Sequence, residues 1–378
     1  MLIAASLGLT LRMIQAGLIP GHFKHLMHTH SHIALLGWLY NASLIILQYT
    51  IFKKKEGAFN TVFWLSQITF VGMMFSFPFQ GYAFASITFS TLYLFCSYYL
   101  VYILFKESIR IENTYVVKFI QWGGIYLVLS SFGPFSLGFI MAKGLQDTFW
   151  YKLSIYWFLH FLYNGFFVFV VFAYFLNKLH SHVNQKAIFW LMNLSVIPIY
   201  FLSTLWLDPD FSLYAVALIG SIFQAIAFVL LLKGKKILSL FTDSWTKIVF
   251  AITLVVYVLK MVFQVFSVAP SIQEFLSDTV AYSIIGFIHL VMLGYFTLLF
   301  FIIFIKEKML PLSRTFKIGM AFLITGIILS ETLLFAQSIA FHFQYFTIPN
   351  FHTLLFYASA LMPFGIAFLV WIALTEKE

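Results

Sequence analysis

The chain has 378 residues, of which 62% are hydrophobic and only 9% are charged. About a quarter of the residues in soluble globular domains carry a charge, so this composition excludes an ordinary soluble globule. The mean hydropathy of +0.96 and the 49 phenylalanines predict a polytopic helical membrane protein. The net charge of +9 does not indicate nucleic-acid binding, because the basic residues are distributed as in a membrane topology.

Twelve apolar runs are long enough to cross a hydrocarbon core of about 30 Å, which takes roughly 20 residues. They are residues 2–19, 31–52, 61–79, 82–105, 118–141, 153–176, 186–206, 213–232, 247–268, 279–305, 316–338 and 351–374. We therefore expect an all-α fold, a polytopic transmembrane bundle of about 12 helices, with residues 1–378 forming one integral membrane domain. Arg12 interrupts the first run and no basic segment precedes it, so we expect a retained helix and not a signal peptide.

The lysines and arginines predict the orientation of the bundle. Most of them lie after every second apolar run, in the segments 53–55, 106–118, 178–186, 233–247 and 306–317, and Lys377 lies in the tail. The opposite loops hold only Lys24, Lys143 and Lys152. Because basic loops remain in the cytoplasm, we expect a multi-pass protein of the inner (plasma) membrane with both termini cytoplasmic.

A histidine cluster opens the second run, in the segment Gly21-His-Phe-Lys-His25-Leu-Met-His28-Thr-His30-Ser-His32. Successive residues of a helix turn by about 100°, so His25, His28 and His32 share one stripe, while His30 points to another side or belongs to the loop. Imidazole is the commonest biological metal ligand. The cluster could also be an interfacial group wetted by lipid headgroups, but so many histidines at one helix mouth favour a bound metal ion or haem.

Three further histidines lie at a similar depth. At 1.5 Å per residue, His160 lies about 12 Å into the sixth run and His289 about 15 Å into the tenth, and His352 opens the twelfth. All of these runs enter the membrane from the outside, as the second run does. We therefore predict that His32, His160 and His289 converge in one pocket in the outer (periplasmic) half of the bundle.

Ionisable side chains also occur inside the apolar runs, at Arg12, Lys260 and Glu331. A charge at such a depth costs a few kcal/mol even on the mildest scales, so it is usually paired or functional. One interpretation is a structural ion pair between Lys260 and Glu331 that joins two helices. The other places Arg12 and Lys260 at the site, where they would face the propionates of a haem.

The segment His30-Ser-His32-Ile-Ala-Leu-Leu-Gly37-Trp38, at the start of the second of twelve helices, resembles the haem–copper oxidase subunit I superfamily, including its NnrS-like members. That family has twelve helices, cytoplasmic termini and haems in the outer half of the membrane. The resemblance implies that His32 is a haem ligand on helix two, His160 a copper ligand on helix six and His289 a haem ligand on helix ten.

The chain also departs from the family pattern. Run 186–206 has no histidine, where the oxidases carry an adjacent pair for copper, and the tenth run has one histidine where they usually have two. The sixth run reads His160-Phe-Leu-Tyr163-Asn164 in place of His-Pro-Glu-Val-Tyr. A full copper centre cannot be built from the matched positions, which leaves a scaffold for one or two haems or a reduced metal site.

We therefore expect a haem-binding or copper-binding membrane protein that acts in electron transfer, in nitric oxide or oxygen handling, or in sensing. Its partners would be membrane lipid and a redox partner or a small gaseous ligand. The expected cofactor-binding residues are His32, His289, His30, His28, Arg12 and Lys260, and the expected metal ligands are His32, His160, His289 and His352.

Two arrangements of a haem are open. His32 and His289 could clamp one closed haem, which we favour, or His289 could hold an open haem beneath His160. Two other functions are also open, namely a transporter or metal-handling permease with a histidine-lined outward-facing site and a scaffold that has lost its cofactors. The chain shows no obvious pair of Gly/Pro-broken helices in matching halves, which argues against transport.

Overall fold

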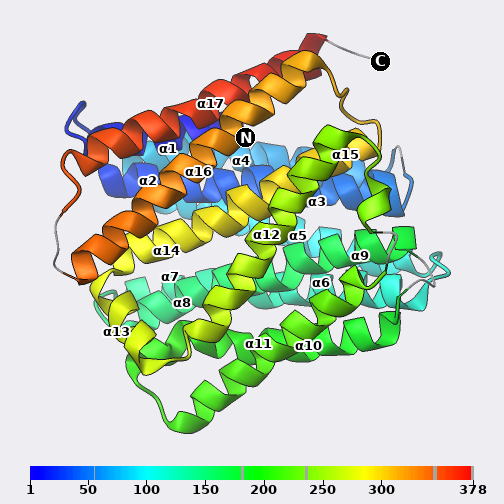
Figure 1. Cartoon of the computed structure of the whole chain (residues 1–378), viewed down its shortest axis with the longest axis horizontal. Coiled ribbons are helices and arrows are strands. Elements are labelled where there is room, and N and C mark those ends of the chain that lie inside the picture. Colours follow the sequence, from blue (N-terminus) through cyan, green and yellow to red (C-terminus); the bar gives the residue numbers. More distant parts are fainter. Residues whose placement is uncertain (55, 180–182, 235–236, 344–346, 376–378) are drawn as a thin grey trace.

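The computed structural model describes the chain except residues 55, 180–182, 235–236, 344–346 and 376–378, and the side chains of residues 277–278 and 280–281. The regular elements of the described residues are all helices, as the sequence predicts. The long helices run across the molecule in both directions and form one bundle (Figure 1).

Eleven continuous helical spans in the described residues are long and apolar enough to cross a membrane. Five of them contain more than one element, and the first four of these are Phe23–Ile51, with α2 (Phe23–His32), η1 (Ile33–Leu39), α3 (Tyr40–Ile46) and η2 (Leu47–Ile51); Thr114–Ala142, with α6 (Thr114–Ser130) and α7 (Phe132–Ala142); Phe149–Leu179, with α8 (Phe149–His160), η3 (Phe161–Phe167) and α9 (Val168–Leu179); and Gln185–Leu207, with α10 (Gln185–Tyr200) and η5 (Phe201–Leu207).

The other spans are α4 (Ala58–Gln80), α5 (Phe84–Ser108), α11 (Phe211–Leu232), α12 (Ser244–Phe266), the span Tyr282–Lys306 within α14 (Val280–His289), η7 (Leu290–Thr297) and α15 (Leu298–Lys306), α16 (Arg314–His342) and α17 (Phe351–Thr375). Short helices α13 (Pro270–Asp278) and η6 (Leu238–Leu240) lie in connections.

The first predicted run gives a shorter helix than expected. Helix α1 (Leu2–Gln15) has 14 residues and a rise of about 21 Å at 1.5 Å per residue, which is less than the hydrocarbon thickness. Gly17 follows it with a φ of +71°, in the left-handed region where the helix cannot continue. The twelve predicted runs therefore correspond to eleven candidate spans and one helix of partial length.

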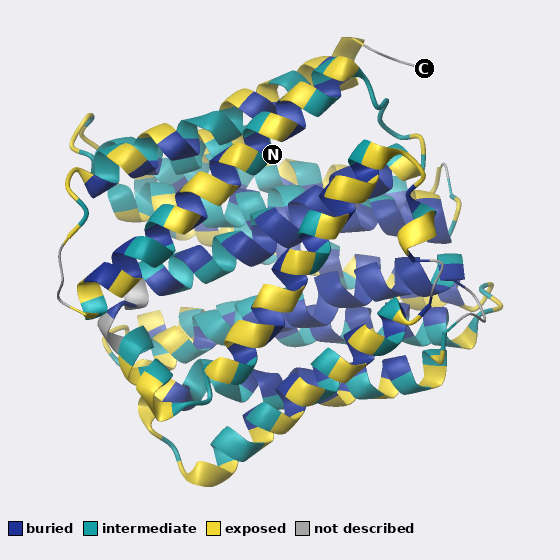
Figure 2. Ribbon diagram, viewed as in Figure 1, coloured by how far each residue is buried: buried dark blue, intermediate teal, exposed yellow. Residues whose placement is uncertain are grey.

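Three of the spans are inner helices. In Phe23–Ile51, Phe149–Leu179 and Tyr282–Lys306, 72%, 89% and 78% of the most apolar window is buried, compared with 28–44% in the other eight spans. Dark blue, buried residues accordingly gather along the middle of the bundle, while the outermost helices carry many exposed residues (Figure 2). A helix that is apolar on all sides is buried by its neighbours, so the inner helices are the natural place for an enclosed site.

The inner helices share one local pattern. In each of them a histidine is followed at once by a π-helical segment, namely η1, η3 or η7, whose fifth residue is a glycine. Single π-helical turns inside α-helices occur frequently at functional sites. The histidine and glycine pairs are His32 and Gly37, His160 and Gly165, and His289 and Gly294.

The glycine of this pattern lets a neighbouring helix approach closely. A Cβ atom at Gly165 would lie 2.8 Å from Cγ of Tyr126 on α6, and one at Gly294 would lie 3.3 Å from Cγ1 of Val256 on α12. A side chain at Gly165 would therefore force α6 and the inner helix apart, whereas at Gly294 the contact would be tight. The pattern combines a loosened helical turn with close packing directly beside a histidine.

Candidate functional site

Among the histidines predicted to bind a cofactor, the structure brings His30 and His289 together. Their ring centroids lie 6.4 Å apart, and the planes of the two rings are nearly perpendicular, at 84°. His30 lies in the last turn of α2 and His289 is the last residue of α14. Two inner helices therefore meet at a pair of imidazoles.

The Nδ1 atom of each ring faces an oxygen atom from another helix, α1 for His30 and α16 for His289. Nδ1 of His30 lies 2.9 Å from the carbonyl oxygen of Ala4 on α1, and Nδ1 of His289 lies 3.7 Å from Oε1 of Glu331 on α16. Metal-binding histidines usually donate their second ring N–H to a carbonyl or a carboxylate, which fixes the tautomer and the ring orientation. In both rings this arrangement leaves Nε2 as the nitrogen that can bind a metal ion.

Helix α1 lies directly against His30. A Cβ atom at Gly8 would stand 3.0 Å from Cε1 of the His30 ring, so the absence of a side chain at this position makes room for the imidazole. The short first helix therefore forms one wall of the site, and it supplies the backbone carbonyl that orients His30.

Two buried charged groups lie beside the histidine pair. Arg12 on α1 is 9% exposed and Glu331 is 5% exposed. An Nη atom of Arg12 donates a hydrogen bond to Oε1 of Gln15 over 3.0 Å, and the guanidinium interacts electrostatically with Glu331 and His289. Ser330 donates to Oε1 of Glu331 over 3.2 Å, whereas Oε2 has no hydrogen-bond partner. The site thus holds one permanent cation and a carboxylate that is only partly hydrogen-bonded.

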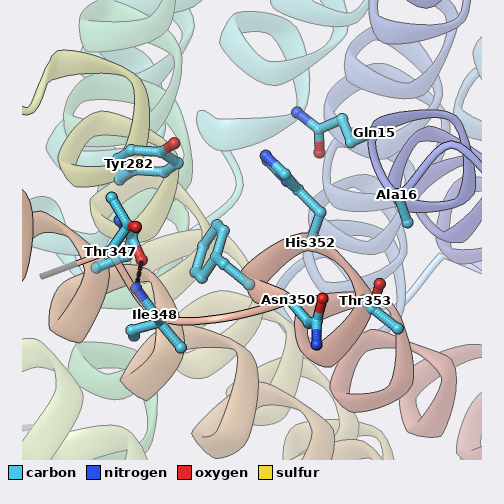
Figure 3. A pocket seen from close by; sticks show the side chains of 10 residues that line it. Gln15, Ala16, Tyr282, Thr347, Ile348, Asn350, His352 and Thr353 are labelled. Carbon is cyan, nitrogen blue, oxygen red and sulfur yellow. Dashed lines mark hydrogen bonds between the residues drawn. The ribbon is translucent and has the colours of Figure 1, made fainter.

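A cavity of about 400 Å³ lies next to Arg12 at the same end of the bundle. The side chains of Gln15 and His352 project into it from α1 and α17, with Tyr282 on the opposite side (Figure 3). Its lining contains no acidic residue, and Nδ1 of His352 has no hydrogen-bond partner. Since Gln15 contacts both the cavity and Arg12, this recess offers hydrogen-bond donors to an anionic group close to the buried guanidinium.

His28 and His32 lie on another side of α2. The His32 ring lies against the Phe77 ring of α4, with centroids 4.5 Å apart, and its Nδ1 lies 2.9 Å from the His28 carbonyl oxygen. The His28 ring meets the Tyr82 ring edge to face at 4.6 Å. Burial in the connection between α4 and α5 raises the pKa of the Tyr82 hydroxyl. Helical spacing predicts this separation of His30 from the stripe that contains His28 and His32.

His160 has both ring nitrogens engaged. Its Nε2 lies 2.7 Å from the carbonyl oxygen of Val196 on α10, and its Nδ1 lies 3.2 Å from the side-chain nitrogen of Asn164. The ring is 2% exposed. His160 therefore behaves as a hydrogen-bonded core histidine and is not part of the His30–His289 pair.

Lys260 lies in a separate polar cluster on α12. Its ammonium donates hydrogen bonds to the side-chain oxygens of Gln224 and Gln264. The structural ion pair between Lys260 and Glu331, which the sequence allowed, is not formed. Within the residues that the structure describes, no three histidine, cysteine or acidic side chains are close enough to hold a metal ion. His32, His160, His289 and His352 therefore do not form a three-ligand metal group in this part of the chain.

Comparison with known proteins does not assign the chain to a family. No model of a known protein family matches the chain, and no curated protein is similar to it. The fold and the site together define a class, an all-helical multi-pass membrane protein whose inner helices present two facing histidines.

Proposed function

We propose that this is a haem-binding integral membrane protein in which His30 and His289 bind one haem iron from opposite faces. The observation that carries the proposal is the separation of the two rings. A bond from a metal ion to an imidazole nitrogen is about 2.0 Å long, so two axial Nε2 atoms are about 4 Å apart and their ring centroids a little more than 6 Å apart. The distance of 6.4 Å between His30 and His289 fits this requirement.

The surroundings of the pair support the same proposal. Both Nδ1 atoms face the kind of oxygen atom that metal-binding histidines use. Arg12 and the donors of the adjoining cavity, including His352 and Gln15, would receive the two propionates. Lys260 has no part in this arrangement, because its hydrogen bonds are made to glutamines on α11 and α12.

A haem with two axial histidines supplies one-electron transfer and leaves no open face for a small ligand. The residues of this chain would orient it: Ala4 and Glu331 each face the Nδ1 atom of one imidazole. We therefore propose electron transfer with a redox partner as the function, in preference to nitric oxide or oxygen binding. The sequence resemblance to haem–copper oxidase subunit I supports haem, whereas the two engaged nitrogens of His160 give no support to a copper ion.

Absorption spectroscopy of the detergent-purified protein tests this function. We expect one b-type or similar haem per chain by pyridine haemochrome analysis, a Soret band with resolved α and β bands of six-coordinate low-spin iron, and no spectral change with carbon monoxide. The proposal would be contradicted if folded protein from haem-replete cells contained no haem. Rapid binding of carbon monoxide would instead support an open haem with one axial histidine.

We also propose that the histidine-rich end of the bundle faces the outside of the plasma membrane, with both termini in the cytoplasm. In a background in which Cys96, the single cysteine, is replaced by serine, Lys143→Cys and Lys308→Cys place thiols at exposed sites between successive spans. A membrane-impermeant thiol reagent should label position 143 in intact cells and position 308 only after permeabilisation, because basic loops stay in the cytoplasm. The reverse labelling pattern would show the opposite orientation.

A further inference from the structure

Lys260 is a buried cation without a carboxylate partner. Its side chain is 0% exposed, and Nζ donates to Oε1 of Gln224 on α11 over 2.8 Å and to Oε1 of Gln264 over 3.1 Å. Within the described residues, no aspartate or glutamate oxygen lies within 4.0 Å of this nitrogen. An ammonium has three N–H donors, so one of them makes no hydrogen bond, and the charge is offset by two amide oxygens and the face of the Tyr257 ring in place of a carboxylate.

Two neighbouring side chains also have donors without partners. Nε2 of Gln224 and the hydroxyl of Tyr257 are buried and make no hydrogen bond. Gln224 is bonded to Lys260 through its other amide atom, and the Tyr257 ring centroid lies 5.2 Å from Nζ of Lys260. A buried donor left without an acceptor costs about 1–3 kcal/mol, so the free donors of Gln224 and Tyr257, two side chains in contact with Lys260, indicate an acceptor beside the ammonium.

The protein itself does not supply that acceptor. His160 interacts electrostatically with Lys260, but Val196 and Asn164 occupy both of its ring nitrogens. The buried carboxyl group of Glu331 does not supply it either, because it faces His289 and Ser330. The missing acceptor must therefore come from solution.

We propose that Lys260, Gln224 and Tyr257 enclose a small monovalent anion of the halide class, such as chloride. A single negative charge balances the single ammonium, and the three free donors match an anion that only accepts hydrogen bonds. The walls are aromatic: the Tyr257 ring lies 4.6 Å from both Phe228 and Tyr295. Such walls favour a weakly hydrated monovalent anion, because removing phosphate or sulfate from water costs far more. The site shares no residue with the histidine pair and does not depend on haem.

The test uses the purified full-length protein, exchanged into gluconate buffer and titrated with sodium chloride or bromide at constant ionic strength. We expect a saturable rise in the thermal unfolding temperature, and one halide per chain released on denaturation, measured by ion chromatography. Lys260→Met should abolish both effects. The matched control is Lys247→Met, an exposed lysine on the same helix, which should respond as the wild type does.

A second variant keeps the proposal testable if Lys260→Met does not fold. Gln224→Glu places a carboxylate where the Lys260 ammonium already donates, so the variant should fold and should lose at least tenfold in halide affinity, because the internal carboxylate replaces the anion. A wild-type protein that is indifferent to halide, or a Gln224→Glu variant with an undiminished halide response, would overturn the proposal. The first of these results would mean that water fills the place between the donors.

Discussion

Replacement of His30 by alanine is expected to turn a closed haem into one that binds carbon monoxide. In the proposed arrangement His30 and His289 both bind the haem iron, so loss of one imidazole would leave the iron with a vacant face and change it from low spin to high spin. His289 remains oriented by Glu331, so the haem should be retained with a shifted Soret band. Absorption spectra with and without carbon monoxide measure the change.

His32→Ala is the matched control for this experiment. His32 is also a histidine in the last turn of α2, but its ring lies against Phe77 and its removal should leave the six-coordinate spectrum intact. The resemblance to the oxidase subunit assigns the ligand role to His32, whereas the ring distances favour His30. A carbon monoxide complex in His32→Ala and none in His30→Ala would show that the resemblance identifies the ligand correctly.

Replacement of Arg12 by methionine is expected to destabilise the protein, because it removes the cation that interacts with the buried Glu331 carboxyl group. Breaking a buried ion pair by removing one partner costs about 3–5 kcal/mol. No N–O distance below 4.0 Å joins Arg12 to Glu331, so we expect a smaller loss, on the order of 2–3 kcal/mol. Thermal or detergent-induced unfolding of the purified protein measures the effect.

A double-mutant cycle separates this coupling from lost packing. Glu331→Gln removes the negative charge at nearly constant shape, so the variant with both substitutions should recover much of the stability that Arg12→Met alone loses. Additive losses in the double variant would mean that the two groups do not interact. In that case, the proposed contact with haem propionates would be the remaining explanation for the burial of Arg12.

The fold class could be predicted from hydropathy because the helices must satisfy their backbone groups within lipid. The partial length of α1 was missed, since hydropathy continues past Gly17 while the backbone does not. Hydropathy also cannot separate inner from outer helices, because lipid and protein interior are equally apolar surroundings. The histidine followed by a glycine five residues later, found in all three inner helices, was a usable signal.

The site was harder to predict, because the depth of a residue along a helix does not say which side of the helix its side chain occupies. Lys260 and Glu331 lie at similar depth but face different neighbours, and His160 faces a backbone carbonyl. Helical spacing did separate His30 from the stripe of His28 and His32, but only the packing of α1 and α14 decides which side faces the partner histidine.

The pattern shared by the three inner helices recurs at a regular interval along the chain. With α1 counted first, the inner helices are the second, sixth and tenth of twelve, as in three tandem copies of a four-helix unit. In each copy the patterned histidine contacts the next helix of its own unit, at Phe77, Val196 or Glu331. His30 stands two residues before its patterned histidine, and the corresponding positions in the other copies are Phe158 and Phe287. The histidine pair is therefore formed between units, by His30 of the first and His289 of the third, and phenyl rings stand at the position of His30 in the other two units.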